Sequence, residues 1–159
     1  MDVSLSRTPV KAFKMMLVAI AMMMLVAFAA PAAQKVQCLE NPAMERAVFD
    51  LVNQQRKNAG LKALTWSTPL SHCAQLRANE CGVKFSHTRP NGQPWYTVNQ
   101  KLMFGENLGR NYYSQHTLVY AWLCSQTHKA VLMNPNFKTA AVAVHTVGNQ
   151  NYWAMEFGY

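Results

Sequence analysis

The order of the hydrophobic patterns along the chain predicts an α+β domain, with helices first and an antiparallel pair of strands last. After residue 41, apolar residues recur with the 3.6-residue period of a helix. Near the C-terminus they change to the two-residue period of a strand. Because helices precede the strands instead of alternating with them, we do not expect a repeated βαβ unit.

A first helix is predicted from Pro42 to about Asn58. Asn41 and Pro42 supply a capping side chain and a proline at the first helical position, and Gly60 follows where the helix should end. One face carries the apolar positions i, i+3, i+4, i+7 and i+8, which are Met44, Ala47, Val48, Leu51 and Val52. We expect this face to pack in the core rather than against a membrane or a partner.

A second helix is predicted by Thr68 and Pro69, with Gly82 closing it after Cys81. Its predicted inner face consists of Leu70, Cys73, Ala74, Ala78 and Cys81. A third helix is predicted over about residues 115–125, and the residues it should bury are Leu118, Ala121 and Trp122.

The segment from Val83 to Arg110 is rich in Gly, Pro and Asn, which predicts a long loop with short elements. Loops of this length in compact domains are commonly functional. This one holds His87 and Glu106.

Two alternating segments, 140–147 and 151–157, predict a β-hairpin with Gly148 and Asn149 at its turn. In the second segment one side should present Trp153, Met155 and Phe157, and the other Tyr152, Ala154 and Glu156.

The first 29 residues have the pattern of a signal peptide. Three basic residues at 7, 11 and 14 precede an uncharged apolar run from Met15 to Ala30, and small residues follow. A membrane-spanning helix usually needs about 20 apolar residues, so an uncleaved anchor is the alternative. We expect residues 30–40 to be a spacer and 41–159 to be the folded domain. The protein should then be extracellular or in the cell envelope, touching a membrane only through an uncleaved signal segment.

Length and charge fit one ordinary domain. The 159 residues include 15 Lys and Arg against 7 Asp and Glu, a formal net charge of +8. Removing residues 1–29 takes away three basic residues and one acidic residue, which leaves 12 against 6, or +6. These charges are scattered, so we expect no nucleic-acid partner. We expect a monomer.

Four cysteines, at positions 38, 73, 81 and 124, suggest disulfides in an exported chain. Eight residues of helix rise about 12 Å, beyond the roughly 7 Å reach of a disulfide, which disfavours pairing Cys73 with Cys81. Cys38 would then pair with one of these two and Cys124 with the other. The alternative is four separate thiols. Zinc held by cysteines is not expected, because there is no Cys-x2-Cys pair.

The residues able to carry chemistry are histidines and a few carboxylates. No signature of a serine hydrolase, a zinc protease or a phosphate-binding loop is present. The candidates are therefore His72, His87, His116, His128, His145, Glu80, Glu106 and Glu156.

Seven short motifs follow one another in a recognisable order: Leu51-Val52-Asn53-x-x-Arg56, Gly60-Leu61-x-x-Leu64-x-Trp66, Phe85-Ser86-His87-Thr88, Gly105-Glu106-Asn107-Leu108, Trp122-x-x-Ser125-x-x-His128, Leu132-Met133-Asn134-Pro135-x-Phe137 and Tyr152-Trp153. Together they resemble bacterial CAP domains. These are the SCP-like relatives of cysteine-rich secretory proteins, insect venom antigens and plant pathogenesis-related proteins. The resemblance covers about Glu45 to Phe157.

The resemblance implies a three-layer α-β-α sandwich with a central antiparallel sheet and a surface cleft. In many eukaryotic members two His and two Glu line that cleft. The matching positions here are His87, Glu106 and His128, and Ser125 stands where the second Glu would be.

The resemblance also implies a function, which we expect to be binding rather than catalysis. The ligand would be an envelope lipid, glycan or peptide, or a divalent metal such as zinc held by His87 and His128, with no cofactor required. One alternative is a metal-assisted hydrolase of peptides or envelope material, with His87 or His128 as base and Glu106 as its partner. The other is a structural secreted module, in which these residues only brace the long loop.

Aromatic residues flank the cleft motifs and could form an apolar wall for a ligand, although core packing is the expected role of most. They are Trp95, Tyr96, Phe104, Tyr112 and Tyr113.

Overall fold

The structure, a computed structural model, describes residues 41–159. The predicted signal peptide and spacer lie outside the described residues, as does Cys38. None of the helices in the described part combines the length and apolarity needed to cross a membrane.

The first predicted helix is confirmed as α2, Pro42–Asn58. The Asn41 side chain accepts a hydrogen bond from the Met44 N–H at 3.2 Å, and Gly60 adopts a φ of 74° after the helix end. The buried face of α2 is rotated about the helix axis relative to the predicted apolar face. Of the predicted residues, Val48 and Val52 are buried, whereas Met44, Ala47 and Leu51 are half-buried. The full set of buried residues is Glu45, Val48, Phe49, Val52 and Arg56.

The second helix, α3, spans Thr68–Val83, and both of its predicted ends need correction. Ser67 caps it by accepting a hydrogen bond from the Leu70 N–H at 3.3 Å. Gly82 lies inside the helix, where an added Cβ would come within 2.9 Å of the His145 ring. This glycine therefore serves close packing and does not end the helix. All five residues of the predicted inner face are buried.

The third predicted helix is followed by another that the sequence pattern did not indicate. α4 spans Gln115–Cys124 and α5 spans Gln126–Leu132. Ser125 between them has an extended backbone, with ψ of 122°, which ends α4 and places Ser125 at the N-cap position of α5. In α4, Leu118 and Trp122 are buried as predicted, and Ala121 is half-buried.

Four strands form one sheet in the order β1-β3-β4-β2. The predicted hairpin is confirmed as β3, Thr139–Val147, and β4, Gln150–Gly158. β2, Gly105–Arg110, pairs antiparallel with β4 at one edge, and the two-residue β1, Thr65–Trp66, pairs parallel with β3. The predicted long loop therefore ends in a strand, after a short 3-10 helix, η1, at Trp95–Val98.

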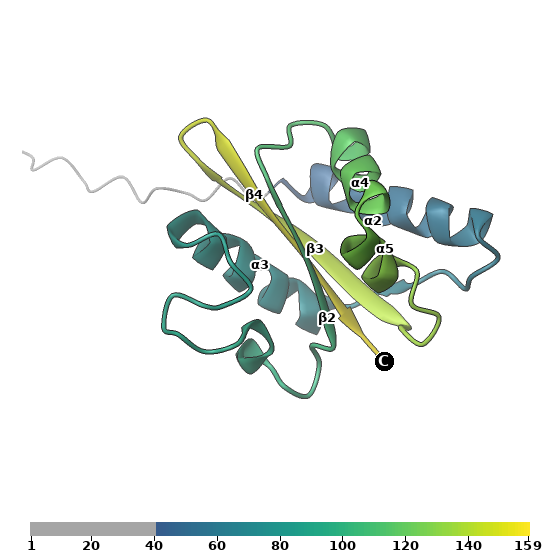
Figure 1. Cartoon of the computed structure of the whole chain (residues 1–159), viewed down its shortest axis with the longest axis horizontal. Coiled ribbons are helices and arrows are strands. Elements are labelled where there is room, and N and C mark those ends of the chain that lie inside the picture. Colours follow the sequence, from purple (N-terminus) through teal and green to yellow (C-terminus); the bar gives the residue numbers. More distant parts are fainter. Residues whose placement is uncertain (1–40) are drawn as a thin grey trace, which may run out of the picture. The chain divides into compact units, whose positions relative to one another are not determined.

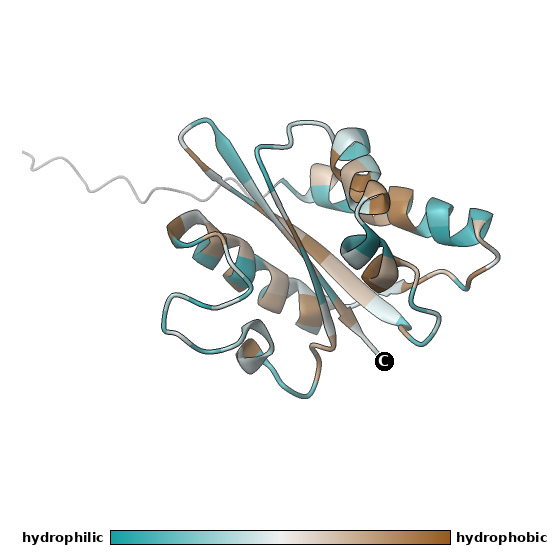
Figure 2. Ribbon diagram, viewed as in Figure 1, coloured by the Kyte–Doolittle hydropathy of each residue, from teal (hydrophilic) through white to brown (hydrophobic). Residues whose placement is uncertain are grey.

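The helices cover both faces of the sheet, which confirms the α-β-α sandwich (Figure 1). α2, α4 and α5 pack on the face that carries Trp153, Met155 and Phe157 of β4. α3 packs on the opposite face, against Tyr152 and Ala154. Hydrophobic residues occur along the helices, whereas the C-terminal end of α2 is hydrophilic (Figure 2). Because both faces are covered, β4 is buried from Asn151 to Gly158.

The three described cysteines are free thiols. Cys73 and Cys81 are buried in α3, whereas Cys124 is exposed at the end of α4. The predicted pairing of Cys124 with Cys73 or Cys81 is wrong, because the sheet separates the two helices.

Candidate functional site

Glu106 and Asn107, two neighbouring residues of the edge strand β2, form hydrogen bonds to the two segments that carry His87 and His128. The Glu106 carboxylate lies on the α3 side, 2.7 Å from Nδ1 of His87. The Asn107 side chain donates a hydrogen bond to the backbone oxygen of His128 in α5 at 3.0 Å. Successive side chains of a strand point to opposite faces. One strand therefore fastens a segment from each outer layer.

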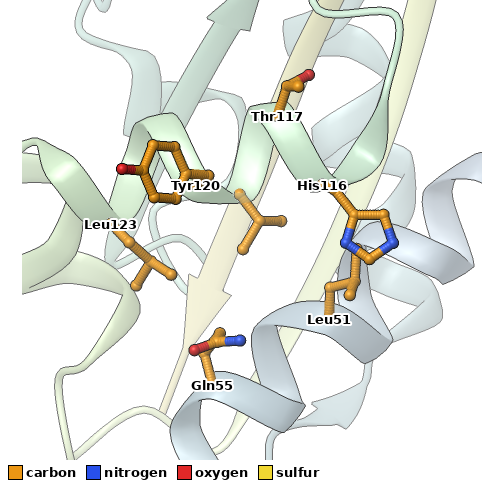
Figure 3. A pocket seen from close by; sticks show the side chains of 7 residues that line it. Leu51, Gln55, His116, Thr117, Tyr120 and Leu123 are labelled. Carbon is orange, nitrogen blue, oxygen red and sulfur yellow. The ribbon is translucent and has the colours of Figure 1, made fainter.

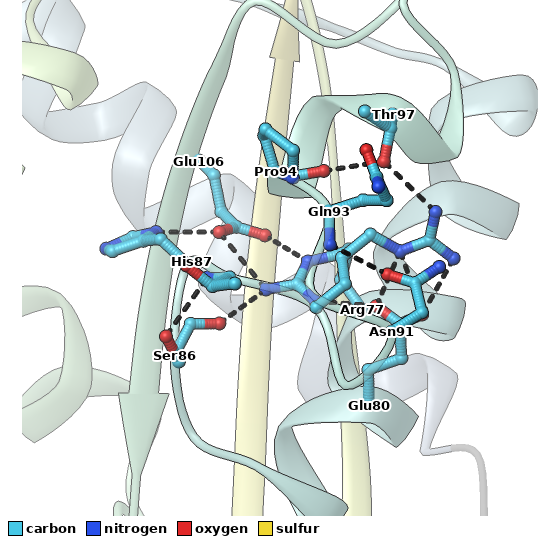
Figure 4. A network of polar contacts seen from close by, with 11 residues as sticks. Arg77, Glu80, Ser86, His87, Asn91, Gln93, Pro94, Thr97 and Glu106 are labelled. Carbon is cyan, nitrogen blue, oxygen red and sulfur yellow. Dashed lines mark hydrogen bonds and ion pairs between the residues drawn. The ribbon is translucent and has the colours of Figure 1, made fainter.

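Arg77 of α3 is the centre of the polar network (Figure 4) and is fully buried. Its Nε donates to Glu106 Oε2 at 2.7 Å, one terminal nitrogen donates to the Ser86 backbone oxygen at 2.7 Å, and the other donates to Glu80 Oε2 at 2.6 Å. Burial lowers the pKa of Arg77, but the hydrogen bond to Glu106, the charge of Glu106 and the hydrogen bond to Glu80 outweigh that effect and raise it above its ordinary value. The guanidinium stays charged and joins α3, β2 and the loop.

A second arginine secures the loop farther along. Arg89 donates to Glu80 Oε1 from two nitrogens, at 2.8 and 2.9 Å, and to the Thr97 hydroxyl at 3.2 Å. The Thr97 hydroxyl in turn donates to the Pro94 backbone oxygen at 2.6 Å. Burial raises the pKa of Glu80, but hydrogen bonds from Arg89 and Arg77 outweigh this and lower it below its ordinary value. The loop is therefore tied to α3 by charged hydrogen bonds.

His87 is held firmly and yet is open to solvent. Its side chain is 54% exposed, whereas that of Glu106 is 1% exposed. A carboxylate only accepts hydrogen bonds, so Nδ1 carries the hydrogen, and in the neutral form of the ring Nε2 keeps a free lone pair. A carboxylate that orients an imidazole in this way is typical of histidines that bind a ligand or a metal.

His128 and Ser125 complete the predicted cleft residues. His128 is half-buried, and its pKa is lowered first by burial and then by the charge of His87. The two rings are therefore within electrostatic reach of each other. Ser125 lies at the junction of α4 and α5, with its Oγ 3.2 Å from the Thr127 hydroxyl. The hydrogen bonds of residues 41–159 do not join Ser125 to the other three.

The donor atoms near His87 do not fit a zinc centre. Both oxygens of Glu106 are engaged by Arg77 and by Nδ1 of His87, which leaves the two imidazoles. Catalytic zinc sites typically have three protein ligands. In the described part of the chain, no group of three or more His, Cys, Asp or Glu is arranged to hold a metal ion.

The flanking aromatic residues do not form one wall. Trp95 packs with the core on the α3 side, and Tyr112 packs with the core on the α2 side. Tyr96, Phe104 and Tyr113 are exposed.

The other candidate histidines lie elsewhere. His72 is exposed on α3 and His145 is half-buried on β3. His116 borders an apolar hollow of about 480 Å³ between α2 and α4 (Figure 3). That hollow is lined by Leu51, Gln55, His116, Thr117, Val119, Tyr120 and Leu123.

Arg77 is the main residue of the site that the sequence did not single out. It lies one helical turn after Cys73 and Ala74, on the predicted inner face of α3. A charged side chain at such a position needs a buried partner, and this signal was present in the sequence. Glu156, one of the candidate carboxylates, is fully buried directly opposite Glu106.

An α-β-α domain with a Glu-oriented histidine at the edge of its sheet is the class of domain that the motifs predict. The family model described as the CAP, or cysteine-rich secretory protein, family matches residues 49–157, and the chain belongs to this family.

Relatives and solved structures agree with this assignment. The uncharacterized protein YkwD of Bacillus subtilis (strain 168) is 29% identical over 123 residues, which are 72% of this chain and 47% of YkwD. The chain thus spans about half the length of this relative. The fold is similar to an outer surface protein of Borrelia burgdorferi, with a TM-score of 0.63, 22% identity, and coverage of 71% of this chain and 90% of that one. It is also similar to an extracellular SCP-domain protein of Bacillus anthracis, with a TM-score of 0.64, 21% identity, and coverage of 74% and 40%.

Proposed function

We propose that this chain is an exported protein that binds a glycan- and peptide-containing polymer of the cell envelope through His87 and His128, without catalysing its turnover. The pattern of residues 1–29 supports export. Structural neighbours described as outer surface or extracellular bacterial proteins are in keeping with that location.

The observation that carries the proposal is that His87 is both fixed and exposed. A histidine that only braced a loop would gain most from burial, yet more than half of this side chain faces solvent. The bracing is done by Arg77, which is fully buried and holds the Ser86 backbone oxygen. A side chain already held in one orientation loses little freedom when a ligand binds.

The chemistry of the two imidazoles indicates the ligand. The Nε2 lone pair of His87 can accept a hydrogen bond from a sugar hydroxyl or a peptide N–H. His128 is kept neutral at pH 7 by its lowered pKa, so it can also accept one. The apolar hollow that could take an acyl chain lies between α2 and α4, away from these residues.

Binding is favoured over catalysis because the site offers no activated nucleophile. In the part of the chain that the structure describes, no Ser, Thr or Cys side chain is hydrogen-bonded to either imidazole. Glu106 is held by Arg77 and His87, so it is not free to activate a water molecule.

The test is calorimetric titration of the purified protein with soluble muropeptides, using His87→Ala and, as the matched control, His72→Ala, an exposed histidine outside the network. Loss of one hydrogen bond, about 1 kcal/mol, should weaken binding by about fivefold in His87→Ala, with no change in the control. Equal affinity of His87→Ala and wild type would overturn the proposal. A zinc titration of the same proteins tests the metal-binding alternative.

A further inference from the structure

The proposed binding role of His87 does not use Glu156, a buried carboxyl group on β4. Glu156 is directly opposite Glu106 in the β2–β4 ladder and has no exposed surface. Tyr152 and Ala154, on the same face of β4, pack on the α3 side, so both carboxyl groups lie beneath α3. Side chains directly opposite each other on paired strands have Cβ atoms about 5 Å apart.

The groups that face Glu156 come from the three elements around it. β2 supplies Glu106, and β3 places Ala141 opposite Glu156, which adds no titratable group. No N–H or O–H group within residues 41–159 donates a hydrogen bond to either oxygen of Glu156. The titratable or charged groups of α3 in its electrostatic range are Arg77, Cys73 and Cys81.

The charges of this interior balance only if Glu156 is neutral. Arg77 and Arg89 are paired with Glu106 and Glu80, two positive groups with two negative ones. An ionised Glu156 would add an unpaired negative charge in the interior, which is strongly unfavourable. Burial and then the neighbouring Glu106 raise the pKa of Glu156 well above its ordinary value. Glu106 is the residue directly opposite Glu156, and neither oxygen of Glu156 has another hydrogen-bond partner within residues 41–159.

We infer that Glu156 and Glu106 hold one proton between them, and that this shared proton locks Glu106 in the position from which it orients His87. While the proton is present, Glu156 donates it to Glu106, and Glu106 remains the strand carboxylate that Arg77 binds. When the proton leaves to bulk water, two carboxylates compete for Arg77. Glu106 then has no fixed place from which to hold Nδ1 of His87.

The shared proton, called the lock below, depends on the proposed function only where its effect on ligand binding is concerned. The proton itself is a property of the folded protein without any ligand. The experiment therefore measures the proton first and binding second.

The direct measurement is infrared spectroscopy of the protein at pH 7. The carbonyl stretch of a protonated carboxyl group should be present in wild type and absent in Glu156→Gln, which keeps the shape without the proton. Glu45→Gln is the matched control, because Glu45 is a buried carboxyl group of α2 outside this pair, and it should leave the band unchanged. A wild-type spectrum without the band, or a band that persists in Glu156→Gln, would overturn the inference.

The pH dependence of unfolding gives a second readout. Because the folded pKa of Glu156 is raised, its contribution to stability is complete below the ordinary value of 4.5 and is lost as pH rises through the folded pKa. Wild type and Glu156→Gln should therefore melt together near pH 4, and wild type should melt several degrees lower at pH 9. Parallel profiles would refute the shared proton. If Glu156→Gln does not fold, the disappearance of the wild-type infrared band with rising pH tests the same point.

Muropeptide titration then separates the two proposals. Wild-type binding should weaken over the pH range in which the band disappears, and binding by Glu156→Gln should not. If muropeptides bind equally well without His87, the proposed function fails while the spectroscopic result stands. If binding requires His87 but wild type and Glu156→Gln have the same pH profile, the lock fails and the function stands.

Discussion

Removing the buried guanidinium with Arg77→Met should sharply destabilise the domain. Arg77 is fully buried and donates to Glu106, whose side chain is 1% exposed, and to the Ser86 backbone oxygen. Methionine would fill much of the same volume but leave a buried carboxylate and a carbonyl without their donor. Breaking a buried ion pair in this way costs about 3 to 5 kcal/mol, a large fraction of a typical unfolding free energy of about 5 to 15 kcal/mol.

The assay is urea unfolding at pH 7, with Arg56→Met as the control. Arg56 is equally buried but donates to backbone oxygens, those of Lys62, Leu132 and Asn134. Arg56→Met removes donors from backbone oxygens but strands no carboxylate, so it should lose less stability than Arg77→Met. The double variant Arg77→Met, Glu106→Gln should recover part of the loss. An Arg77→Met variant within about 1 kcal/mol of wild type, or a double variant less stable than the single one, would refute the buried-pair argument.

Two further predictions concern the core. In a Cys38→Ser background at pH 8, a thiol reagent should modify the exposed Cys124 at once and should reach Cys73 and Cys81 only on unfolding. The reason is that burial raises the pKa of Cys81 to about 11 and that of Cys73 above its ordinary value. Three thiols that react equally fast would contradict the packing of α3. Gly109→Ala should lower the unfolding free energy by about 1 to 3 kcal/mol, because the added Cβ would overlap the buried Leu118 side chain. An unchanged unfolding free energy in urea would show that α4 is not packed so closely on β2.

The sequence predicted the elements whose signals are local. Asn41 with Pro42 marked the start of α2, and the alternation from Ala140 onward marked the hairpin. The missed features depend on tertiary contacts. Gly82 has the composition of a helix end, but its position is fixed by the His145 ring of a strand far along the chain. α5 is only one residue removed from α4, so its pattern merged with the preceding helix.

The candidate site was predictable in its histidines and Glu106, but not in the charges beneath them. His87, Glu106 and His128 came from motif resemblance, and the structure links the first two directly. Arg77 lies on the inner face that the helical period predicted, yet its partners are 29 and 9 residues away, at Glu106 and Ser86. The pairing of Glu156 with Glu106 requires the β2–β4 register, which periodicity alone does not give.

The ¹⁵N spectrum of the His87 imidazole at pH 7, without ligand and then with muropeptides, tests whether Glu106 fixes this ring for ligand binding. The prediction is a hydrogen on Nδ1 and a bare Nε2 in the free protein, a selective shift of Nε2 when muropeptides bind, and loss of the tautomer preference in Glu106→Ala. A hydrogen on Nε2 in the free wild-type protein, or a tautomer that Glu106→Ala leaves unchanged, would contradict it.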